Sequence, residues 1–511
     1  MPDMVNTSFI LDMQPKLYRW SASDKGQTFS DLFNLICDRR TLVEAWIRLS
    51  QNRGSQTPGT DGMTRRRIEE QVGGVGHFLD EVQDELRSGR YKPEPVRQRL
   101  IPKSGKPGHF RPLGIPTLKD RLVQMALKFV LEPIFEADFY PNSYGFRRGR
   151  STHDALAAVQ KQLHPTTHGP SMTHYVIEGD IKGCFDAINH HLLMEEVKRR
   201  IRDRKVLVLI RSFLKAGIMI EGSLKHSATG TPQGGVLSPL LANIFLHRLD
   251  QRYDRWMPRP REKPTNAAAR RKFDRRHSKP TFYMVRYADD FVLLVVGSRQ
   301  QAEAERDALA QFLWNNMRLE LSPEKTLITR PEEGFVFLGY RVVRTKSYKN
   351  GNMVGNLRIP VDKLKSLRRE VKKRTSRATL VLPFKDLIWS LNPLITGWRT
   401  YFQYATYACK EFSSLDNWLW HRIDRWLRKK HRKTGARKLR AKYRAGQHPP
   451  LRGRWRDETA TLKQFSQGGT RRYRNRGIRI PNGWNEEELG EDHAMNGAPS
   501  FWPAYRALKS I

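Results

Sequence analysis

The spacing of apolar and polar residues divides most of the chain into segments with a helical or a strand-like pattern. Apolar positions recur at helical spacing in the segments 29–49, 65–89, 119–137, 190–215, 239–248 and 300–316. Short apolar runs bounded by turn residues predict strands at 97–102, 111–115, 175–180, 282–285 and 291–294. Residues 1–30 are polar with little periodicity, so we expect them to form a loosely ordered arm.

One predicted turn carries two adjacent carboxylates. Asp289 and Asp290 end the sequence Tyr-Ala-Asp-Asp, which lies between two predicted strands. Asp-Asp pairs are common in turns, and this pair alone would indicate an ordinary surface turn. A third carboxylate, Asp180, ends another predicted strand. Close carboxylates raise each other's pKa unless a cation neutralises them, and Mg²⁺ prefers carboxylate oxygens. The three could complete a two-cation site of the kind that serves nucleotidyl transfer.

The chain carries far more positive than negative charge. Among its 511 residues, 92 Lys and Arg oppose 52 Asp and Glu, which gives a net charge of +40. A polyanion is the natural partner, with nucleic acid as the first candidate and an anionic membrane surface as the rival. There is no run of about 18 apolar residues, so we expect neither a membrane span nor a membrane partner.

The cysteines and the first residues bear on the cellular compartment. Cys37, Cys184 and Cys409 are widely spaced and form neither a disulfide framework nor a zinc pattern. The first residues lack the basic-then-apolar order of a secretory signal. We therefore expect a reducing, intracellular setting in which the cysteines are buried small apolar residues.

Positive charge is concentrated toward the end of the chain. Residues 361–480 contain 32 Lys and Arg against 8 Asp and Glu, so they hold 24 of the 40 net charges. Tryptophans, among them Trp418, Trp420 and Trp426, alternate with the basic residues. The pattern is typical of an amphipathic helix with a buried tryptophan stripe and a solvated basic face. Since so many unopposed charges would repel one another, the basic face also indicates a phosphate-binding surface.

Two features near the predicted strands 97–102 and 175–180 have both an ordinary and a functional interpretation. Lys103 and Arg111 border a loop rich in Gly and Lys, where they could bind a triphosphate or be surface charges. Phe185 lies five residues after Asp180, where it could exclude a sugar 2′-hydroxyl or be a core aromatic residue.

Two turns are equally ambiguous when each is taken alone. The glycine-rich turn 229–239 contains Gln233 and would let the backbone approach a nucleotide closely. The segment 337–340, Phe-Leu-Gly-Tyr, could support a primer end or simply end a strand.

Together and in this order, the motifs resemble those of a reverse transcriptase, and more closely those of the group II intron-encoded maturase type. The matching segments are Thr57–Gly62, Ile101–Pro116, Tyr144–Arg147 with Gly149–Ser151, Asp180–Asp186, Thr231–Pro239, Tyr287–Asp290, Leu321–Thr326 and Phe337–Tyr340. Leu391–Trp398 and Tyr401 resemble the maturase-specific element. The resemblance covers roughly residues 30–440, and the tail from 441 matches more loosely.

The resemblance implies roles for individual residues. Asp180, Asp289 and Asp290 would be the catalytic carboxylates and would bind metal, with help from the backbone carbonyl of Ile181. Nucleotide contacts are implied for Lys103, Arg111, Phe185, Gln233 and Lys325. Among these, Phe185 would be the sugar gate and Gln233 would lie beside the templating pair. Contacts with primer or template are implied for Thr57 and Gly59 in the loop 51–62, and for Phe337 and Gly339.

The resemblance also implies a fold and a domain order. The fold would be an α+β right-hand polymerase with fingers, an antiparallel-sheet palm, a helical thumb and a basic C-terminal extension. We expect an N-terminal extension at 1–75 with a template-contacting loop, and fingers and palm at 76–345. The thumb or maturase domain would span 346–440, and 441–511 would be a basic tail similar to a DNA-binding region.

The implied function is RNA-directed DNA synthesis with two Mg²⁺ ions, for which Mn²⁺ could substitute. The implied partners are group II intron RNA, an RNA template-primer, a DNA target and dNTPs, and a homodimer is one assembly the resemblance allows. The protein would assist splicing and copy the intron into DNA by target-primed reverse transcription. We expect a bacterial cytoplasmic, nucleoid-associated location, with an organelle as the alternative.

Other functions compete with this one. Because no cysteine follows Cys409, we expect the nuclease module with paired cysteines and histidines to be absent. A Val-Thr-Gly block of the retron type is not found. A splicing cofactor with an idle polymerase is one alternative, although all three aspartates are present. A domesticated or defence-linked reverse transcriptase is another, and a generic basic RNA-binding protein ranks last because it would need no aspartate triad.

Overall fold

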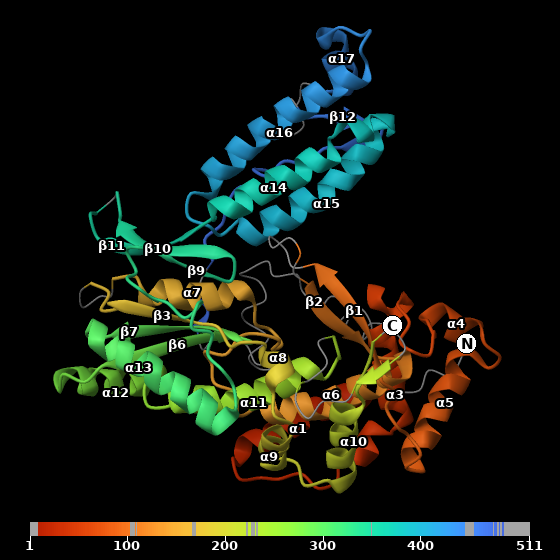
Figure 1. The fold of residues 1–511 in the computed structure, drawn as a ribbon, viewed down its shortest axis with the longest axis vertical. Coiled ribbons are helices and arrows are strands. Elements are labelled where there is room, and N and C mark those ends of the chain that lie inside the picture. The colour runs from red at the N-terminus through yellow and green to blue at the C-terminus, as the bar shows by residue number, and fades with distance from the viewer. Residues whose placement is uncertain are drawn as a thin grey trace. The chain divides into compact units, whose positions relative to one another are not determined.

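The computed structural model describes residues 9–102, 108, 110–165, 170–220, 223–225, 230, 234–348, 350–444, 454–473, 475–477, 480 and 483–484. These residues form two compact units (Figure 1). The first unit contains the described residues up to 158, those of 173–328 and those beyond 475. The second contains those of 159–172 and 329–475.

Helices make up most of the first unit. They are α1 (Phe9–Ser23), α2 (Phe33–Ile36), α3 (Arg39–Ser50), α4 (Arg65–Glu70), α5 (Gly74–Arg87), α6 (Leu118–Glu136), α7 (Thr152–Gln162, which ends in the second unit), α8 (Cys184–Ala187), α9 (His190–Lys198), α10 (Arg204–Lys215), α11 (Ser238–Arg252), α12 (Pro264–Arg276) and α13 (Arg299–Phe312), with a 3₁₀ turn η1 (Arg53–Gln56) and a π-helical turn η2 (Leu313–Met317).

Two four-stranded sheets complete the first unit. One has the order β2-β1-β4-β5, and its strands are β1 (Val96–Pro102), β2 (Phe110–Ile115), β4 (Ile218–Ile220) and β5 (Ser223–Lys225). The other has the order β6-β7-β3-β8, and its strands are β3 (Tyr175–Gly179), β6 (Thr281–Tyr287), β7 (Asp290–Val296) and β8 (Ile328–Thr329). The pairs β1–β2, β4–β5, β6–β7 and β3–β7 are antiparallel, whereas β1–β4 is parallel. The mixture of helices and antiparallel strands confirms the α+β class.

The core of the first unit is built around α6. Apolar residues occur on every side of this helix, and nearly all of them are buried, because α1 and α3 pack along it. Its N-cap is Thr117, whose side chain accepts a hydrogen bond from the amide of Asp120 at 3.1 Å. The predicted helix at 119–137 is confirmed.

A helix occupies much of the segment 1–30, which we expected to be loosely ordered, so that expectation was wrong. Helix α1 lies on α6, where Leu17 is buried and where Gln14 and Ser21 donate hydrogen bonds of 2.9 and 2.7 Å to main-chain carbonyls. The buried positions follow helical spacing, but two of them are polar. Their partners exist only in the tertiary structure, so the apolar pattern alone concealed the helix.

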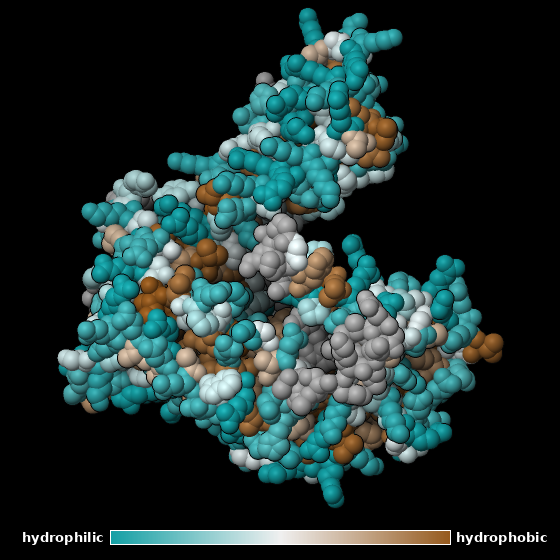
Figure 2. All heavy atoms as spheres, in the orientation of Figure 1, coloured by the Kyte–Doolittle hydropathy of each residue, from teal (hydrophilic) through white to brown (hydrophobic). Residues whose placement is uncertain are grey.

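The second unit combines a small sheet with long helices. Its strands are β9 (Phe335–Phe337), β10 (Tyr340–Lys346) and β11 (Met353–Arg358), in the antiparallel order β11-β10-β9, and the short pair β12 (Arg456–Asp457) and β13 (Ala460–Thr461). Its helices are α14 (Val361–Arg374), α15 (Phe384–Phe402), α16 (Ala408–Lys430) and α17 (Ala436–Tyr443), with a 3₁₀ turn η3 (Arg377–Val381). On the face shown in Figure 2, hydrophilic side chains cover most of this unit.

Helix α16 carries the tryptophans and basic residues noted in the sequence. Trp426 is buried and donates a hydrogen bond to Thr379, whereas Trp418 and Trp420 are half-buried. Arg425 and Lys429 are exposed on the same helix. The predicted tryptophan stripe is therefore buried only at Trp426, whereas the predicted exposed basic face is confirmed at Arg425 and Lys429.

Within the described ranges, the chain contains no helix with the length and apolar character needed to cross a bilayer.

Candidate active site

The two adjacent aspartates lie at the tight turn of a hairpin. Strands β6 and β7 pair antiparallel, with Tyr287 opposite Asp290, so only Ala288 and Asp289 connect them. Ala288 has a φ of 58°, in the left-handed region that such turns require. The turn therefore holds Asp289 at its tip and Asp290 on the first residue of β7.

The third aspartate joins them through strand pairing. Strand β3 pairs with β7 with Gly179 opposite Phe291, and Asp180 directly follows Gly179, so it comes beside Asp290. A Cβ atom at Gly179 would lie 2.1 Å from the Phe291 ring, so only glycine permits this packing. One edge of the sheet therefore gathers all three carboxylates.

The electrostatics of this edge favour the arrival of positive charge. Desolvation, together with the negative charge of Asp180, raises the pKa of Asp289 above its ordinary value. The Asp290 residue reaches the surface, yet surrounding protein removes much of the water from its carboxyl group. This desolvation, with the charges of Asp289 and Asp180, raises the pKa of Asp290 to about 6.

Two cationic side chains act on the aspartates. Nζ of Lys325 donates a hydrogen bond of 2.6 Å to Oδ2 of Asp180. Arg111 is exposed on β2, and its positive charge offsets part of the rise in the pKa of both Asp289 and Asp290. Over the part of the chain that the structure describes, no three His, Cys, Asp or Glu side chains converge on one metal position, and Asp180 is turned to the lysine.

Main-chain hydrogen bonds on either side of Ile181 fix the direction of its carbonyl group. The carbonyl of Asp180 accepts a hydrogen bond from the amide of Ser322 at 2.8 Å, and the amide of Lys182 donates one to Glu320 at 2.9 Å. Ile181 lies between these two bonds, so in antiparallel pairing its own carbonyl points to the opposite side of the strand. That side is the one on which β7 and the acidic turn lie.

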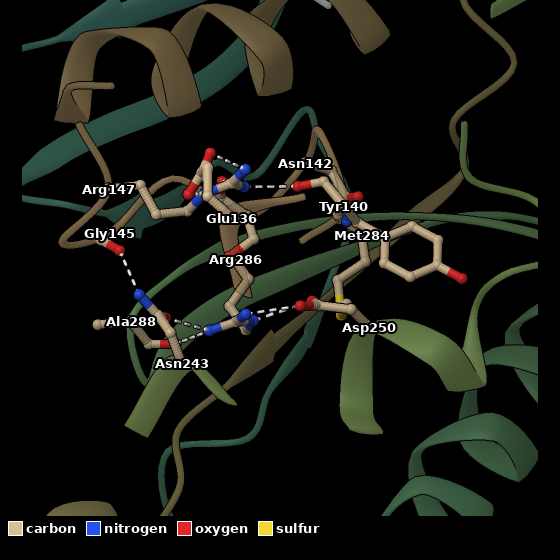
Figure 3. A network of polar contacts seen from close by, with 11 residues as sticks. Glu136, Tyr140, Asn142, Gly145, Arg147, Asn243, Asp250, Met284, Arg286 and Ala288 are labelled. Atoms are coloured by element: carbon tan, nitrogen blue, oxygen red, sulfur yellow. Dashed lines mark hydrogen bonds and ion pairs between the residues drawn. The ribbon is translucent and has the colours of Figure 1, made fainter. Parts of the chain in front are cut away.

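A buried ion pair supports the acidic turn from inside the protein (Figure 3). Arg286 on β6 donates hydrogen bonds of 2.9 and 2.6 Å to both carboxylate oxygens of Asp250 on α11, and both side chains are fully buried. The same guanidinium donates to the carbonyl of Ala288 at 2.9 Å and to Oδ1 of Asn243 at 3.1 Å. The position of the turn is thus tied to the core.

The segment 142–145 runs alongside β6 and forms main-chain hydrogen bonds with Arg286. The amide of Arg286 donates to the carbonyl of Asn142 at 3.0 Å, and the amide of Tyr144 donates to the carbonyl of Arg286 at 2.9 Å. At Gly145 a Cβ atom would lie 2.3 Å from the amide nitrogen of Ala288. Two turns, one at Gly145 and one at Ala288, therefore lie in direct contact, and only glycine fits at the first.

Phe185 and Gly234 of the glycine-rich turn follow or contact two different strands. Phe185 is partly buried on α8. Gly234 has a φ of 119°, and a Cβ atom there would lie 2.5 Å from the carbonyl oxygen of Gly114. Gly234 thus packs on β2, the strand that carries Arg111. Lys103 and Gln233, which the sequence predicts to contact the nucleotide, lie outside the described residues.

The predicted template loop is fixed to the start of α6. Arg121 donates hydrogen bonds of 2.8 Å to the carbonyl of Gly54 and 2.6 Å to that of Thr57. A Cβ atom at Gly59 would lie 2.6 Å from the Cα of Thr117. Both predicted residues, Thr57 and Gly59, therefore belong to a loop whose main chain is held against the start of α6 by Arg121 and Thr117.

The two predicted primer residues belong to the second unit. Phe337 ends β9 and is buried, and the turn to β10 consists of Leu338 and Gly339, with φ of 46° and 73°. The hydroxyl of Tyr401 on α15 donates a hydrogen bond of 2.5 Å to the carbonyl of Leu338. The hairpin is therefore anchored on the helix that carries the maturase-like motif.

Several residues of this site were missed by the sequence reasoning. Arg286 and Asp250 form the buried ion pair, Asn243 links Gly145 to Arg286, and Phe146 lies beside Phe185. A signal was present for Arg286, because a charged residue within a run of buried strand positions requires a buried partner. Nothing in the sequence identifies that partner, which is 36 residues away along the chain.

Comparison with known proteins gives the chain two matching families. Residues 101–342 match the family model for reverse transcriptase (RNA-dependent DNA polymerase). Residues 364–444 match the family model for the group II intron maturase-specific domain.

Individual relatives agree with these matches. Over 369 residues the chain is 39% identical to Protein YkfC of Escherichia coli (strain K12). This match covers 70% of this chain and 94% of that protein. Over 410 residues the chain is 32% identical to the group II intron-encoded protein LtrA of Lactococcus lactis subsp. cremoris. This match covers 71% of this chain and 62% of LtrA. It is also 28% identical, over 404 residues, to the putative COX1/OXI3 intron 1 protein of Saccharomyces cerevisiae, covering 72% of this chain and 45% of that protein.

Proposed function

The chain belongs to the reverse transcriptases that carry a group II intron maturase-specific domain, and on this premise we propose that DNA synthesis on an RNA template takes place at Asp180, Asp289 and Asp290. The observation that carries the proposal is the strand register. It places the three carboxylates at one edge of the sheet, beside the cationic Lys325 and Arg111. Such an edge suits phosphoryl transfer, in which charge stabilisation and positioning supply most of the catalysis.

The three aspartates would hold two divalent cations, Mg²⁺ or Mn²⁺ in its place, with the carbonyl of Ile181 as a further ligand. The donor set fits, because hard cations take oxygen ligands and because the carboxyl groups of Asp289 and Asp290 have raised pKa values that a cation would relieve. Lys325 at Asp180 is a positive charge already present at the site. Bound cations would activate the primer 3′-hydroxyl and stabilise the leaving pyrophosphate.

The other residues of the site would bind and orient the deoxynucleotide. Arg111, with Lys103, would contact its triphosphate, since a guanidinium pairs well with phosphate oxygens. Lys325 would add positive charge near the phosphates. Phe185 would exclude a ribose 2′-hydroxyl, and Gln233 would lie beside the templating pair.

In the terms of a right-hand polymerase, we assign β6, β7 and β3 to the palm and β1 and β2 to the fingers. The helices α14, α15 and α16 would form the thumb and maturase region. The loop with Thr57 and Gly59 would contact template, and the hairpin with Phe337 and Gly339 would contact the primer end.

The maturase match supports intron RNA as the partner of the basic second unit, with a role in splicing. We further propose that the protein copies its intron into a DNA target, because intron binding and reverse transcription would then reside in one chain. A splicing cofactor with an idle polymerase is less well supported, since an unused site has no need of three carboxylates at one edge.

Primer extension tests the proposal. Extension of a DNA primer on an RNA template with dNTPs and Mg²⁺ should fall by at least about a hundredfold in Asp289→Asn, while RNA binding stays intact. Glu320→Gln is the matched control, because Glu320 is an exposed carboxylate that pairs with Lys182 on the neighbouring segment. Activity retained in Asp289→Asn would refute the assignment, and loss of RNA binding as well would make the residue structural.

A further inference from the structure

Phe146 has an unusual backbone conformation next to the proposed active site. Its φ is 58°, in the left-handed region that favours glycine, and 50% of the residue is exposed. The residues on both sides, Tyr144, Gly145 and Arg147, are buried. A strained, exposed aromatic residue between buried neighbours contributes little to the core, and such strain persists only where surrounding structure enforces it.

On its N-terminal side, Phe146 is fixed to the acidic turn. Gly145 lies so close to the amide nitrogen of Ala288 that a side chain would not fit. Nδ2 of Asn243 donates a hydrogen bond of 2.8 Å to the carbonyl of Gly145 (Figure 3). Asn243 also accepts from Arg286, the residue that holds Ala288. The same network therefore positions the acidic turn and the residue that precedes Phe146.

On its C-terminal side, Phe146 is fixed by a second buried arginine (Figure 3). Arg147 forms a two-pronged ion pair with Glu136 at the end of α6, with N–O distances of 2.5 to 3.1 Å, and donates to the carbonyls of Tyr140 and Ser143. Both side chains of the pair are buried. With Gly145 and Arg147 held in this way, the backbone at Phe146 has no freedom to relax.

The Phe146 ring meets Phe185. The two ring centroids are 6.4 Å apart and the planes are 81° from parallel, which is the edge-to-face arrangement that aromatic pairs prefer. Phe185 lies five residues after Asp180 on the short helix α8, where one side of it packs against the core and its ring also meets that of Phe146. The strained backbone at Phe146 thus places its ring against the ring of Phe185, which is the proposed sugar gate.

We infer that Phe146 is a positioning residue for sugar selection, which holds the ring of Phe185 where it closes against the 2′ position of the incoming deoxynucleotide. This inference rests on the proposed function and extends it, because it makes the selectivity depend on a residue that is linked to the acidic turn through Gly145 and Asn243.

The test compares deoxynucleotide with ribonucleotide incorporation by the full-length protein. Phe146→Gly should lower the ratio of kcat/KM for dNTP over NTP by roughly 2- to 10-fold, the range expected for loss of one edge-to-face contact. Phe185→Ala should lower it further. The double variant should match Phe185→Ala alone, because Phe146 acts through Phe185.

Stability separates positioning from simple misfolding. Glycine suits a φ of 58°, so Phe146→Gly should keep or raise the Tm while selectivity falls. Phe146→Asn, which also tolerates this conformation, is a second variant. Ser278→Gly is the matched control: Ser278 has a φ of 56° beyond the opposite end of β6, and its replacement relieves the same strain without touching Phe185.

Three results would overturn the inference. One is an unchanged preference for dNTP over NTP in both Phe146 variants, while Phe185→Ala lowers that preference. Another is a double variant whose effects multiply, which would show that the two rings act independently. The third is unchanged selectivity in Phe185→Ala, which would remove the sugar gate itself. Failure of the proposed function is distinct, since it appears as an unmutated protein that does not extend a primer.

Discussion

At the scale of single residues, the fully buried guanidinium of Arg286 connects the acidic turn to the core. Its charge is balanced by Asp250, and its remaining donors reach Asn243 and the carbonyl of Ala288. Buried ion pairs add little net stability over apolar residues, but removal of one partner is costly. The pair therefore contributes more to the position of the turn than to the stability of the fold.

Arg286→Met should destabilise the protein by about 3–5 kcal/mol, because it leaves the charge of Asp250 buried without a partner. Adding Asp250→Leu should recover most of that loss in denaturant unfolding. DNA synthesis should stay about tenfold to a hundredfold low in the double variant, since the carbonyl of Ala288 still lacks its donor and small misplacement of catalytic groups is expensive.

Arg66→Met serves as the control, because Arg66 pairs with Glu70 on an exposed helical surface, where such pairs contribute little. If the double variant recovered full primer extension together with stability, the positioning role of Arg286 would be wrong.

At the scale of elements, the pairing of β3 with β7 decides which carboxylates meet. The register places Gly179 opposite Phe291, and the ring of Phe291 occupies the space that a side chain at Gly179 would need. A shift of the register by one residue would turn Asp180 to the other face of the sheet. A glycine inside this strand is thus required by the packing that aligns the site.

Gly179→Ala should lower stability by about 1–3 kcal/mol through overpacking and should also reduce primer extension, because β3 must move away from β7. Thermal unfolding and extension rates measure the two effects. Combining it with Phe291→Leu, which makes room for the methyl group, should restore part of both. A Gly179→Ala protein with full activity would show that the register tolerates the extra carbon.

Elements also explain where the expected helices were divided. The helical pattern of 65–89 becomes α4 and α5 because Gln71 after α4 is extended, with a ψ of 156°, and Gly73 and Gly74 then adopt positive φ, of 81° and 56°. A left-handed residue cannot continue an α-helix. The apolar period alone passes through such a break, whereas the two adjacent glycines mark it.

At the scale of the whole molecule, the distribution of charge is the dominant feature. The segment 361–480 holds 24 of the 40 net positive charges. Part of this charge is neutralised internally, since Arg428 and Arg440 both pair with Asp424, but residues such as Arg425 and Lys429 remain exposed on α16. A surface of this kind binds polyanions largely through the release of counterions.

Binding of structured RNA should therefore weaken steeply with salt. A plot of log K against log salt should have a slope of about −4 or steeper, as expected for six or more phosphate contacts. Replacing both Arg425 and Lys429 by Gln should make the slope shallower by roughly 1 to 2, measured by filter binding over a range of salt concentrations. Arg66→Gln, a change of exposed charge in the first unit, should leave the slope nearly unaltered. A flat salt response would refute the role of the basic surface.

The sequence by itself determined the local parts of this protein. Short apolar runs on either side of a tight turn predicted β6 and β7, with Asp289 in the turn and Asp290 at the start of β7, and an apolar helical period predicted α6. These features are fixed by backbone geometry and burial within a few residues, so they can be read from the chain alone. The order of motifs was enough to predict the family.

Only the tertiary structure decided which distant residues meet. The pairing of Arg286 with Asp250, the contact of Gly145 with Ala288 and the meeting of Phe146 with Phe185 all join segments tens of residues apart. Helix α1 was concealed for the same reason, since its buried polar groups are satisfied by carbonyls of α6. Polar partners and steric fits depend on register and packing across elements, and no period along the chain records them.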